Sequence, residues 1–90
     1  MRVLVVEDDE RLADVLARGL TEAGHSVEVQ PDGLLGLAAA GLGAFDVLVL
    51  DWMLPGLDGP AVCRALRAQS DRTPVLMLTA RQTVADRVDG

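Results

Sequence analysis

Carboxylates follow two apolar runs in this sequence of 90 residues, and their positions suggest a shared site. Residues 3–6 are all aliphatic and lead into Glu7 and Asp8, while residues 47–50 lead into Asp51. The carboxyl ends of parallel strands meet at one edge of a sheet, where open α/β sheets bind ligands. Two such strands lying side by side would bring the three carboxylates into one pocket. Carboxylates so close together repel one another unless they take up protons or hold a cation.

Oxygen ligands of this kind suit Mg²⁺, which binds one or two carboxylates together with water and phosphate. A carboxylate beside bound Mg²⁺ can attack a phosphoryl group and become an aspartyl phosphate. Asp51 is the best candidate nucleophile, because the loop after it can reach the metal with a backbone carbonyl. Thr79, at the end of a later apolar run, would donate a hydrogen bond to a phosphoryl oxygen. The alternative is that Asp51 simply ends a strand and that residues 7–9 simply cap a helix.

Alternating strand and helix patterns predict the elements that position these residues. Strands are expected over residues 2–7, Ser26–Gln30, 46–51 and 74–79. Helices are expected over residues 10–23 and 33–41, after Asp58, and from residue 83 to residue 89. This order predicts an α/β fold, a doubly wound parallel sheet with right-handed crossovers. The second helix contains several glycines, which weaken the pattern there.

The spacing of apolar residues predicts which side chains face the core. In the first helix five residues share one face: Leu12, Val15, Leu16, Leu20 and Ala23. In the second strand Val27 and Val29 are expected to point inward. In the third helix the expected inward residues are Val62, Cys63 and Leu66. Three aspartates are placed to cap the three helices: Asp9, Asp32 and Asp58.

Length and composition predict a single domain over residues 1–90, with 50% hydrophobic residues. The net charge of −6 and the absence of a basic patch argue against direct contact with nucleic acid. No apolar run approaches the roughly 18 residues that span a membrane, and the N-terminus is not a signal peptide. The single cysteine, Cys63, cannot form an internal disulfide, so a cytoplasmic location is expected.

Three segments give the sequence a close resemblance to a known family. Residues 5–9 read VVEDD, residues 50–59 read LDWMLPGLDG, and residues 78–81 read LTAR. The sequence resembles the receiver domain of two-component response regulators from residue 2 to residue 90, and the middle segment is the most specific. The last two segments are most similar to the subfamily that carries a C-terminal winged-helix DNA-binding domain.

The resemblance implies a function and a set of site residues. Asp51 would accept a phosphoryl group from a sensor histidine kinase, and Thr79 would bond to the phosphate and carry the signal. Asp8 and Asp51 would bind Mg²⁺ directly, and Glu7 would assist through water. The backbone carbonyl of Met53 would complete the protein ligands. Phosphorylation would then switch a protein-interaction surface and regulate transcription through an effector domain that lies outside this chain.

Family members continue through a fifth strand that ends in a Lys and through a fifth helix, whereas this sequence stops at Gly90 and contains no Lys. The resemblance therefore implies a flavodoxin-like (CheY-like) sheet of order 2-1-3-4 without the fifth β/α unit. In that arrangement the helix over residues 10–23 stands alone on its face of the sheet. The strand over residues 74–79 becomes an exposed apolar edge, which predicts self-association.

Two alternatives to the phosphoacceptor function stay open at this stage. A truncated or degenerate receiver would act only through protein contacts, and the missing Lys favours that alternative. A Mg²⁺-dependent phosphohydrolase similar to haloacid dehalogenases would place a second Asp two residues after the first, where this chain has Met53. The chain is therefore not expected to be an enzyme, beyond catalysing its own phosphorylation and dephosphorylation.

Overall fold

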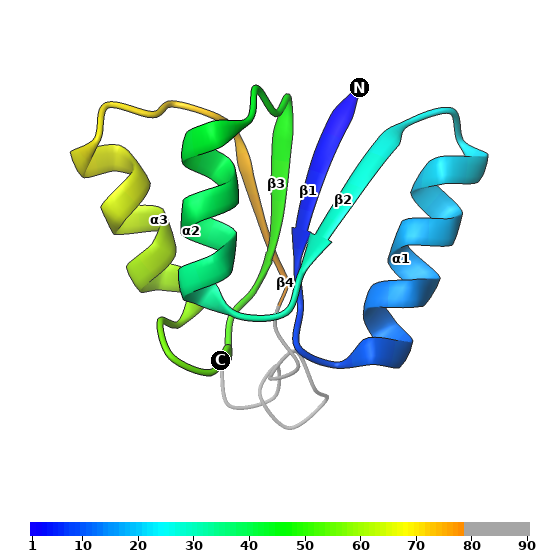
Figure 1. The fold of residues 1–90 in the computed structure, drawn as a ribbon, viewed down its shortest axis with the longest axis horizontal. Helices are drawn as coiled ribbons and strands as arrows, with labels where there is room; N and C mark the ends of the chain where they lie inside the picture. The colour runs from blue at the N-terminus through cyan, green and yellow to red at the C-terminus, as the bar shows by residue number, and fades with distance from the viewer. Residues whose placement is uncertain (79–90) are drawn as a thin grey trace, which may run out of the picture.

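Four parallel strands form one sheet in the computed structural model, which describes residues 1–78 (Figure 1). The strands are β1 (Arg2–Val6), β2 (Ser26–Gln30), β3 (Val47–Asp51) and β4 (Val75–Leu78), and they lie in the order β2-β1-β3-β4. All three strand pairs are parallel. The predicted fold class and strand order are therefore confirmed, with strand ends within one residue of the expected ones.

Three helices cover the sheet in the described part of the chain: α1 (Glu10–Glu22), α2 (Gly33–Leu42) and α3 (Gly59–Ala68). Helix α1 lies on one face, and α2 and α3 lie together on the other (Figure 1). Each helix begins at a predicted cap, because the carboxylates of Asp9, Asp32 and Asp58 accept backbone N–H groups of the first turn. Within residues 1–78, no helix is long and apolar enough to cross a bilayer.

The face under α2 and α3 holds the larger part of the core. Successive side chains of each strand point to opposite faces of the sheet, and every second one lies in this layer. Helix α3 adds Val62 and Leu66. The side chains of this layer that are at most 1% exposed are Leu4, Val6, Leu48, Leu50, Val62 and Leu66. The inward orientation predicted for α3 is thus confirmed for Val62 and Leu66, while Cys63 is only partly buried.

Helix α2 forms in spite of its glycines, and one of these glycines is needed for close packing against the sheet. A Cβ atom on Gly36 would lie 2.7 Å from a methyl group of Val6. Only a residue without a side chain lets the helix approach β1 so closely. The glycine that weakened the sequence pattern therefore stabilises the contact between helix and sheet.

The face under α1 is covered only in part by the described residues. Neighbouring residues of one row across this face are Val29, Val5, Val49 and Leu76. The two central ones are buried, at 0% and 7% exposed, whereas Val29 at one edge is 37% exposed and Leu76 at the other is 57% exposed. Val29 thus lies on the predicted face of the sheet, in one row with Val5, but it is exposed there because β2 is an edge strand.

Helix α1 also buries fewer residues than its apolar pattern predicts. Leu16 and Leu20 pack against the sheet and Ala13 is buried, but Leu12 is 42% and Val15 is 65% exposed. Ala23 is exposed at the C-cap. Since α1 is the one described helix on this face, only the part of its apolar stripe that meets the sheet is covered. The predicted fourth helix, over residues 83–89, lies outside the described residues.

Candidate functional site

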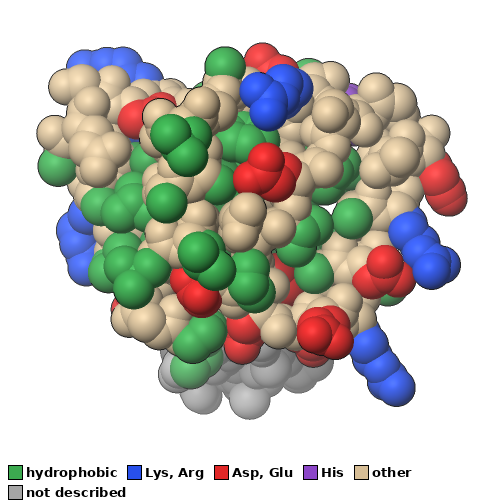
Figure 2. Space-filling view, in the orientation of Figure 1, with side chains coloured by type: hydrophobic (Ala, Val, Ile, Leu, Met, Phe, Trp, Pro, Cys, Tyr) green, Lys and Arg blue, Asp and Glu red, His purple; other side chains and the backbone are tan. Residues whose placement is uncertain are grey.

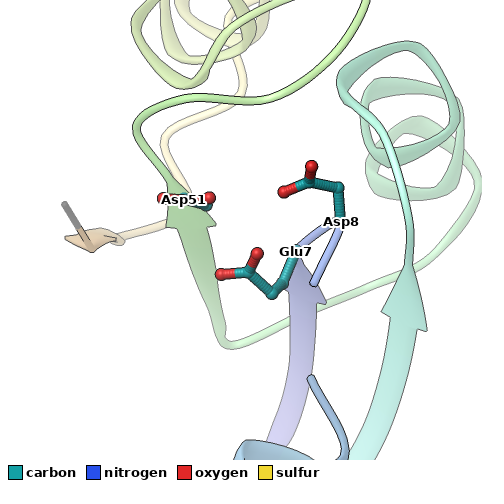
Figure 3. Close-up of side chains that lie close together, drawn as sticks. All are labelled: Glu7, Asp8 and Asp51. Atoms are coloured by element: carbon teal, nitrogen blue, oxygen red, sulfur yellow. The ribbon is translucent and has the colours of Figure 1, made fainter. Parts of the chain in front are cut away.

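The three carboxylates predicted to share a pocket do so at the carboxyl edge of the sheet (Figure 3). Val6 of β1 pairs with Leu50 of β3, so the residues that follow them emerge side by side. Glu7, Asp8 and Asp51 each offer an oxygen, and these oxygens all lie within 4.8 Å of one another. Glu7 is buried, Asp51 is half-buried and Asp8 is exposed. The cluster is therefore open to solvent on the Asp8 side.

Glu7 is the unusual member of the cluster, because this residue is only 3% exposed. One oxygen, Oε2, accepts a hydrogen bond of 2.9 Å from the backbone N–H of Asp9. The other oxygen, Oε1, is buried and has no hydrogen-bond partner among the described residues. Burial, supported by the nearby charge of Asp51, raises the pKa of Glu7 from 4.5 to about 7, although the Asp9 N–H acts against this rise.

These observations fit a cation site made of hard oxygen ligands. A buried carboxylate oxygen without a donor is costly, and a divalent ion or a proton would satisfy it. Two further carboxylates converge on the same point, and divalent ions such as Mg²⁺ prefer oxygen ligands of this type. The donor set of this edge is therefore suitable for Mg²⁺.

The loop after Asp51 folds back over the end of β3. Trp52 donates its backbone N–H to the carbonyl of Leu78 at 2.6 Å, and its own carbonyl accepts the N–H of Gly59 at 2.9 Å. Leu54 is buried in the core below, whereas the side chains of Trp52 and Met53 are 45% and 56% exposed. The loop thus holds Asp51 between two strands and the start of α3. The ligand role of the Met53 carbonyl stays a prediction.

The start of α2 meets the same loop at Gly33, a contact that the sequence did not reveal. The N–H of Gly33 donates to the carbonyl of Pro55 at 3.5 Å. A Cβ atom on Gly33 would overlap the carbonyl group of Leu57. Gly59 is equally confined, against the backbone of Asp51 and Trp52. The signal in the sequence was a glycine at each of these two places, but nothing there showed what it would touch.

Thr79, predicted to bond the phosphoryl group, lies outside the described residues. Strand β4 ends at Leu78, which pairs with Asp51 of β3. Thr79 therefore follows directly in the sequence from a residue beside Asp51, and its role stays a prediction.

Comparison with known proteins decides the family. A family model described as the response regulator receiver domain matches residues 3–90. The chain belongs to this family. The family resemblance predicted from the sequence is thus confirmed, and the domain is a receiver domain of a two-component response regulator.

Relatives and solved structures support the same assignment. The transcriptional regulatory protein TcrA of Mycobacterium tuberculosis is 53% identical over 90 residues, which cover all of this chain and 36% of TcrA. The chain thus spans little more than a third of that relative. A Francisella response regulator receiver domain superposes with a TM-score of 0.87 at 34% identity, covering 98% of this chain and 73% of its own.

A further solved structure is informative about metals. It is the receiver domain of a sensor histidine kinase from Pseudomonas aeruginosa, with a magnesium ion coordinated in its active site cleft. Its TM-score is 0.87 at 32% identity, covering 97% of this chain and 73% of its own.

Proposed function

We propose that Asp51 accepts a phosphoryl group from a sensor histidine kinase in a Mg²⁺-dependent reaction. The observation that carries this proposal is the convergence of Glu7, Asp8 and Asp51 within 4.8 Å. The buried oxygen of Glu7, which has no hydrogen-bond partner within residues 1–78, supports it further, since a positive charge would satisfy that oxygen. The magnesium ion in the similar Pseudomonas receiver domain is consistent with the same use of this edge.

Four residues would hold the ion. Asp8 and Asp51 would bind it directly, Glu7 would bind through water, and Met53 would offer its backbone carbonyl. When bound, Mg²⁺ supplies positive charge that offsets the repulsion between the Asp51 carboxylate and an incoming phosphoryl group.

The chain's own part in the reaction is to present a nucleophile and to stabilise the product. A carboxylate oxygen of Asp51 forms a bond to phosphorus, while the bond between phosphorus and the donor's histidine nitrogen breaks and its electron pair stays on that nitrogen. The hydroxyl of Thr79 donates a hydrogen bond to a phosphoryl oxygen. The loop from Trp52 to Gly59 orients Asp51 through its bonds to β4 and α3.

The output of this reaction would be a changed protein-interaction surface. In this proposal residues 1–90 form the receiver domain. A DNA-binding effector domain outside this chain regulates transcription. The name of TcrA as a transcriptional regulatory protein supports this output. The location would be cytoplasmic, and the chain would act on no substrate beyond its own phosphorylation and dephosphorylation.

A small phosphodonor tests the proposal without the kinase. The chain is incubated with Mg²⁺ and acetyl phosphate, and its intact mass is measured. One phosphoryl adduct is expected in the parent chain and none in Asp51→Asn. Asp46→Asn is the matched control, because Asp46 lies just before β3, near the opposite end of the same strand, and accepts the N–H of Arg2. An adduct that survives in Asp51→Asn would contradict the assignment.

The second candidate function is a receiver that binds protein partners without being phosphorylated. This candidate predicts that Mg²⁺ binds and that no adduct forms in the same experiment. Calorimetric titration with Mg²⁺ beside the mass measurement therefore separates the two candidates.

A further inference from the structure

Helix α2 presents an apolar face to solvent along its whole length. Its ten residues, GLLGLAAAGL, include no charged and no hydrogen-bonding side chain. Three of its leucines are nevertheless exposed: Leu34 at 62%, Leu35 at 48% and Leu42 at 92%. A helix that is apolar all round is normally buried on all sides. The outer face of α2 therefore has the composition of an interface.

The other two described helices differ from α2 in this respect. Helix α1 carries Arg11, Asp14 and Arg18 on its exposed side, and α3 carries Arg64 and Arg67. Figure 2 shows hydrophobic side chains gathered on the face of the molecule where α2 lies in Figure 1. Beside the helix a groove of about 370 Å³ runs along β2, and its lining includes Leu35, Ala38 and Leu42 of α2 together with Arg2 and Glu28 of the neighbouring strands.

We propose that the outer face of α2 (Leu34, Leu35, Ala38, Gly41 and Leu42, called the α2 stripe below) packs against the α2 stripe of a second copy of this chain. Charge restricts where two copies of this chain can meet. Two copies with a net charge of −6 each repel one another, so they can meet closely only where no carboxylate lies at the centre of the contact. The α2 stripe itself contains no charged residue, and the Glu28 carboxylate of the adjoining groove belongs to β2, outside the stripe.

The complementary charges at the two ends of the α2 stripe give the reason for choosing a second copy and define the geometry. Asp32 caps the amino end of α2, and Arg2 lines the groove near Leu42 at the carboxyl end. The Arg2 guanidinium bonds to the carbonyl of Ala44 and lies over the Phe45 ring. Among the described residues neither Asp32 nor Arg2 forms an ion pair. An antiparallel contact brings Asp32 of each copy towards Arg2 of the other.

An antiparallel contact of two identical helices has a twofold axis at its centre. The midpoint between Leu34 and Leu42 is residue 38, an alanine, and Gly41 has open space where a Cβ would be. These small residues let the two helix backbones approach. The axis therefore runs near Ala38, with Leu34 of one copy against Leu42 of the other.

The expected dimer is weak. A ten-residue helix is about 15 Å long, and its contact buries far less than the roughly 1,600 Å² of a standard stable interface. Association should therefore depend on concentration, and it should be visible only at the upper end of the range used in solution studies.

Sedimentation equilibrium over about a hundredfold range of concentration measures this association. The parent chain is expected to approach a dimer, and Leu42→Gln and Leu34→Gln are each expected to weaken the dimer about tenfold. Both side chains are exposed, so circular dichroism should show an unchanged fold. The matched control is Leu76→Gln, which changes an exposed leucine on β4, the edge predicted from the sequence to self-associate.

Cysteine cross-linking tests the antiparallel geometry directly, in a Cys63→Ser background. Ala38→Cys should form a disulfide-linked dimer with itself. Leu34→Cys mixed with Leu42→Cys should form more of the mixed dimer than of either dimer of like chains. A parallel contact would reverse that preference.

Three results would overturn the proposal. The first is a monomer at every concentration, and the second is a dimer that Leu76→Gln disrupts and the α2 variants leave intact. The third is a preference for like-chain cross-links at positions 34 and 42. Loss of the dimer in the α2 variants alone, together with the mixed cross-link, would support it.

Discussion

The same two strands, β1 and β3, build the best-packed part of the molecule and its acidic edge. Val6 and Leu50 are completely buried under α2 and α3. One residue later, Glu7 is buried with no hydrogen-bond partner for one oxygen in the described part of the chain, and Asp51 lies beside it. The interior stabilises the fold by excluding water from apolar side chains, whereas the edge destabilises it by holding carboxylates together. The comparison teaches that the layer under α2 and α3 stabilises the fold and thereby holds an unfavourable cluster in position.

The largest effect should come from the interior. Leu66→Ala removes a side chain that is 0% exposed and should lower the free energy of unfolding by about 2–5 kcal/mol. Leu76→Ala, at a site 57% exposed on the other face, should cost less than about 1 kcal/mol. Urea unfolding of both variants measures the difference. Equal losses would mean that the two faces of the sheet contribute alike.

A smaller loss is expected where the core meets the loop after Asp51. Gly33→Ala forces a Cβ against the carbonyl of Leu57 and should cost about 1–3 kcal/mol, because the loop must move. Gly19→Ala in α1 is the matched control. No atom of residues 1–78 lies within 4 Å of its added Cβ, so it should gain about 0.5–1 kcal/mol through helix propensity. Thermal unfolding measures both variants, and a change of stability in the same direction for the two would refute the contact.

The acidic edge should make stability depend on pH in the metal-free chain. The pKa of Glu7 is raised from 4.5 to about 7, so the folded chain holds this proton more tightly than the unfolded chain. The stabilisation of the fold by this tighter proton binding is complete below pH 4.5 and is lost as the pH rises through about 7. The slope should reach at most about 1.4 kcal/mol per pH unit.

Glu7→Gln should remove this part of the pH dependence and make the metal-free chain more stable at pH 8. Glu10→Gln changes an exposed carboxylate in the first turn of α1 and should leave the dependence in place. Urea titrations at several pH values between 4 and 8 measure both variants. A profile unchanged in Glu7→Gln would assign the dependence to another group.

The smallest effect of the series is stabilisation by added metal. At ten times its dissociation constant, Mg²⁺ should raise the free energy of unfolding by about 1.4 kcal/mol through mass action. Asp8→Asn should abolish most of this gain, because it removes one of three clustered carboxylates, whereas Asp46→Asn should keep it. Calorimetric unfolding with and without Mg²⁺ gives the values, and a gain retained in Asp8→Asn would place the ion elsewhere.

The parallel sheet and the acidic cluster were predictable from the sequence pattern, whereas the strand order 2-1-3-4 came from the family resemblance. Buried parallel strands appear as short aliphatic runs, and their carboxyl ends meet at one edge, so the residues after two runs are neighbours. The sequence could not tell which carboxylate would turn inward. Glu7 continues the alternation of β1 and is buried, while Asp8 turns out to solvent.

Contacts between distant segments were the part that sequence patterns could not supply. The apolar spacing of α1 predicted which residues share one face, but it did not predict the width of that face that the sheet covers. Leu12 and Val15 were therefore wrongly expected to be buried. That width depends on which neighbours share the face. The contact of Gly33 with Leu57 depends likewise on how α2 lies against the loop. Whether Thr79 completes the site stays a prediction.

The position of Trp52 has a practical consequence. It is the sole tryptophan in a sequence with no tyrosine and one phenylalanine, and it stands directly after Asp51. Its indole is 45% exposed, while its backbone is tied to Leu78 and Gly59. Ultraviolet emission from this chain therefore originates almost wholly at one place. Binding or chemistry at the carboxyl edge can be followed optically in the native sequence, without attaching a dye.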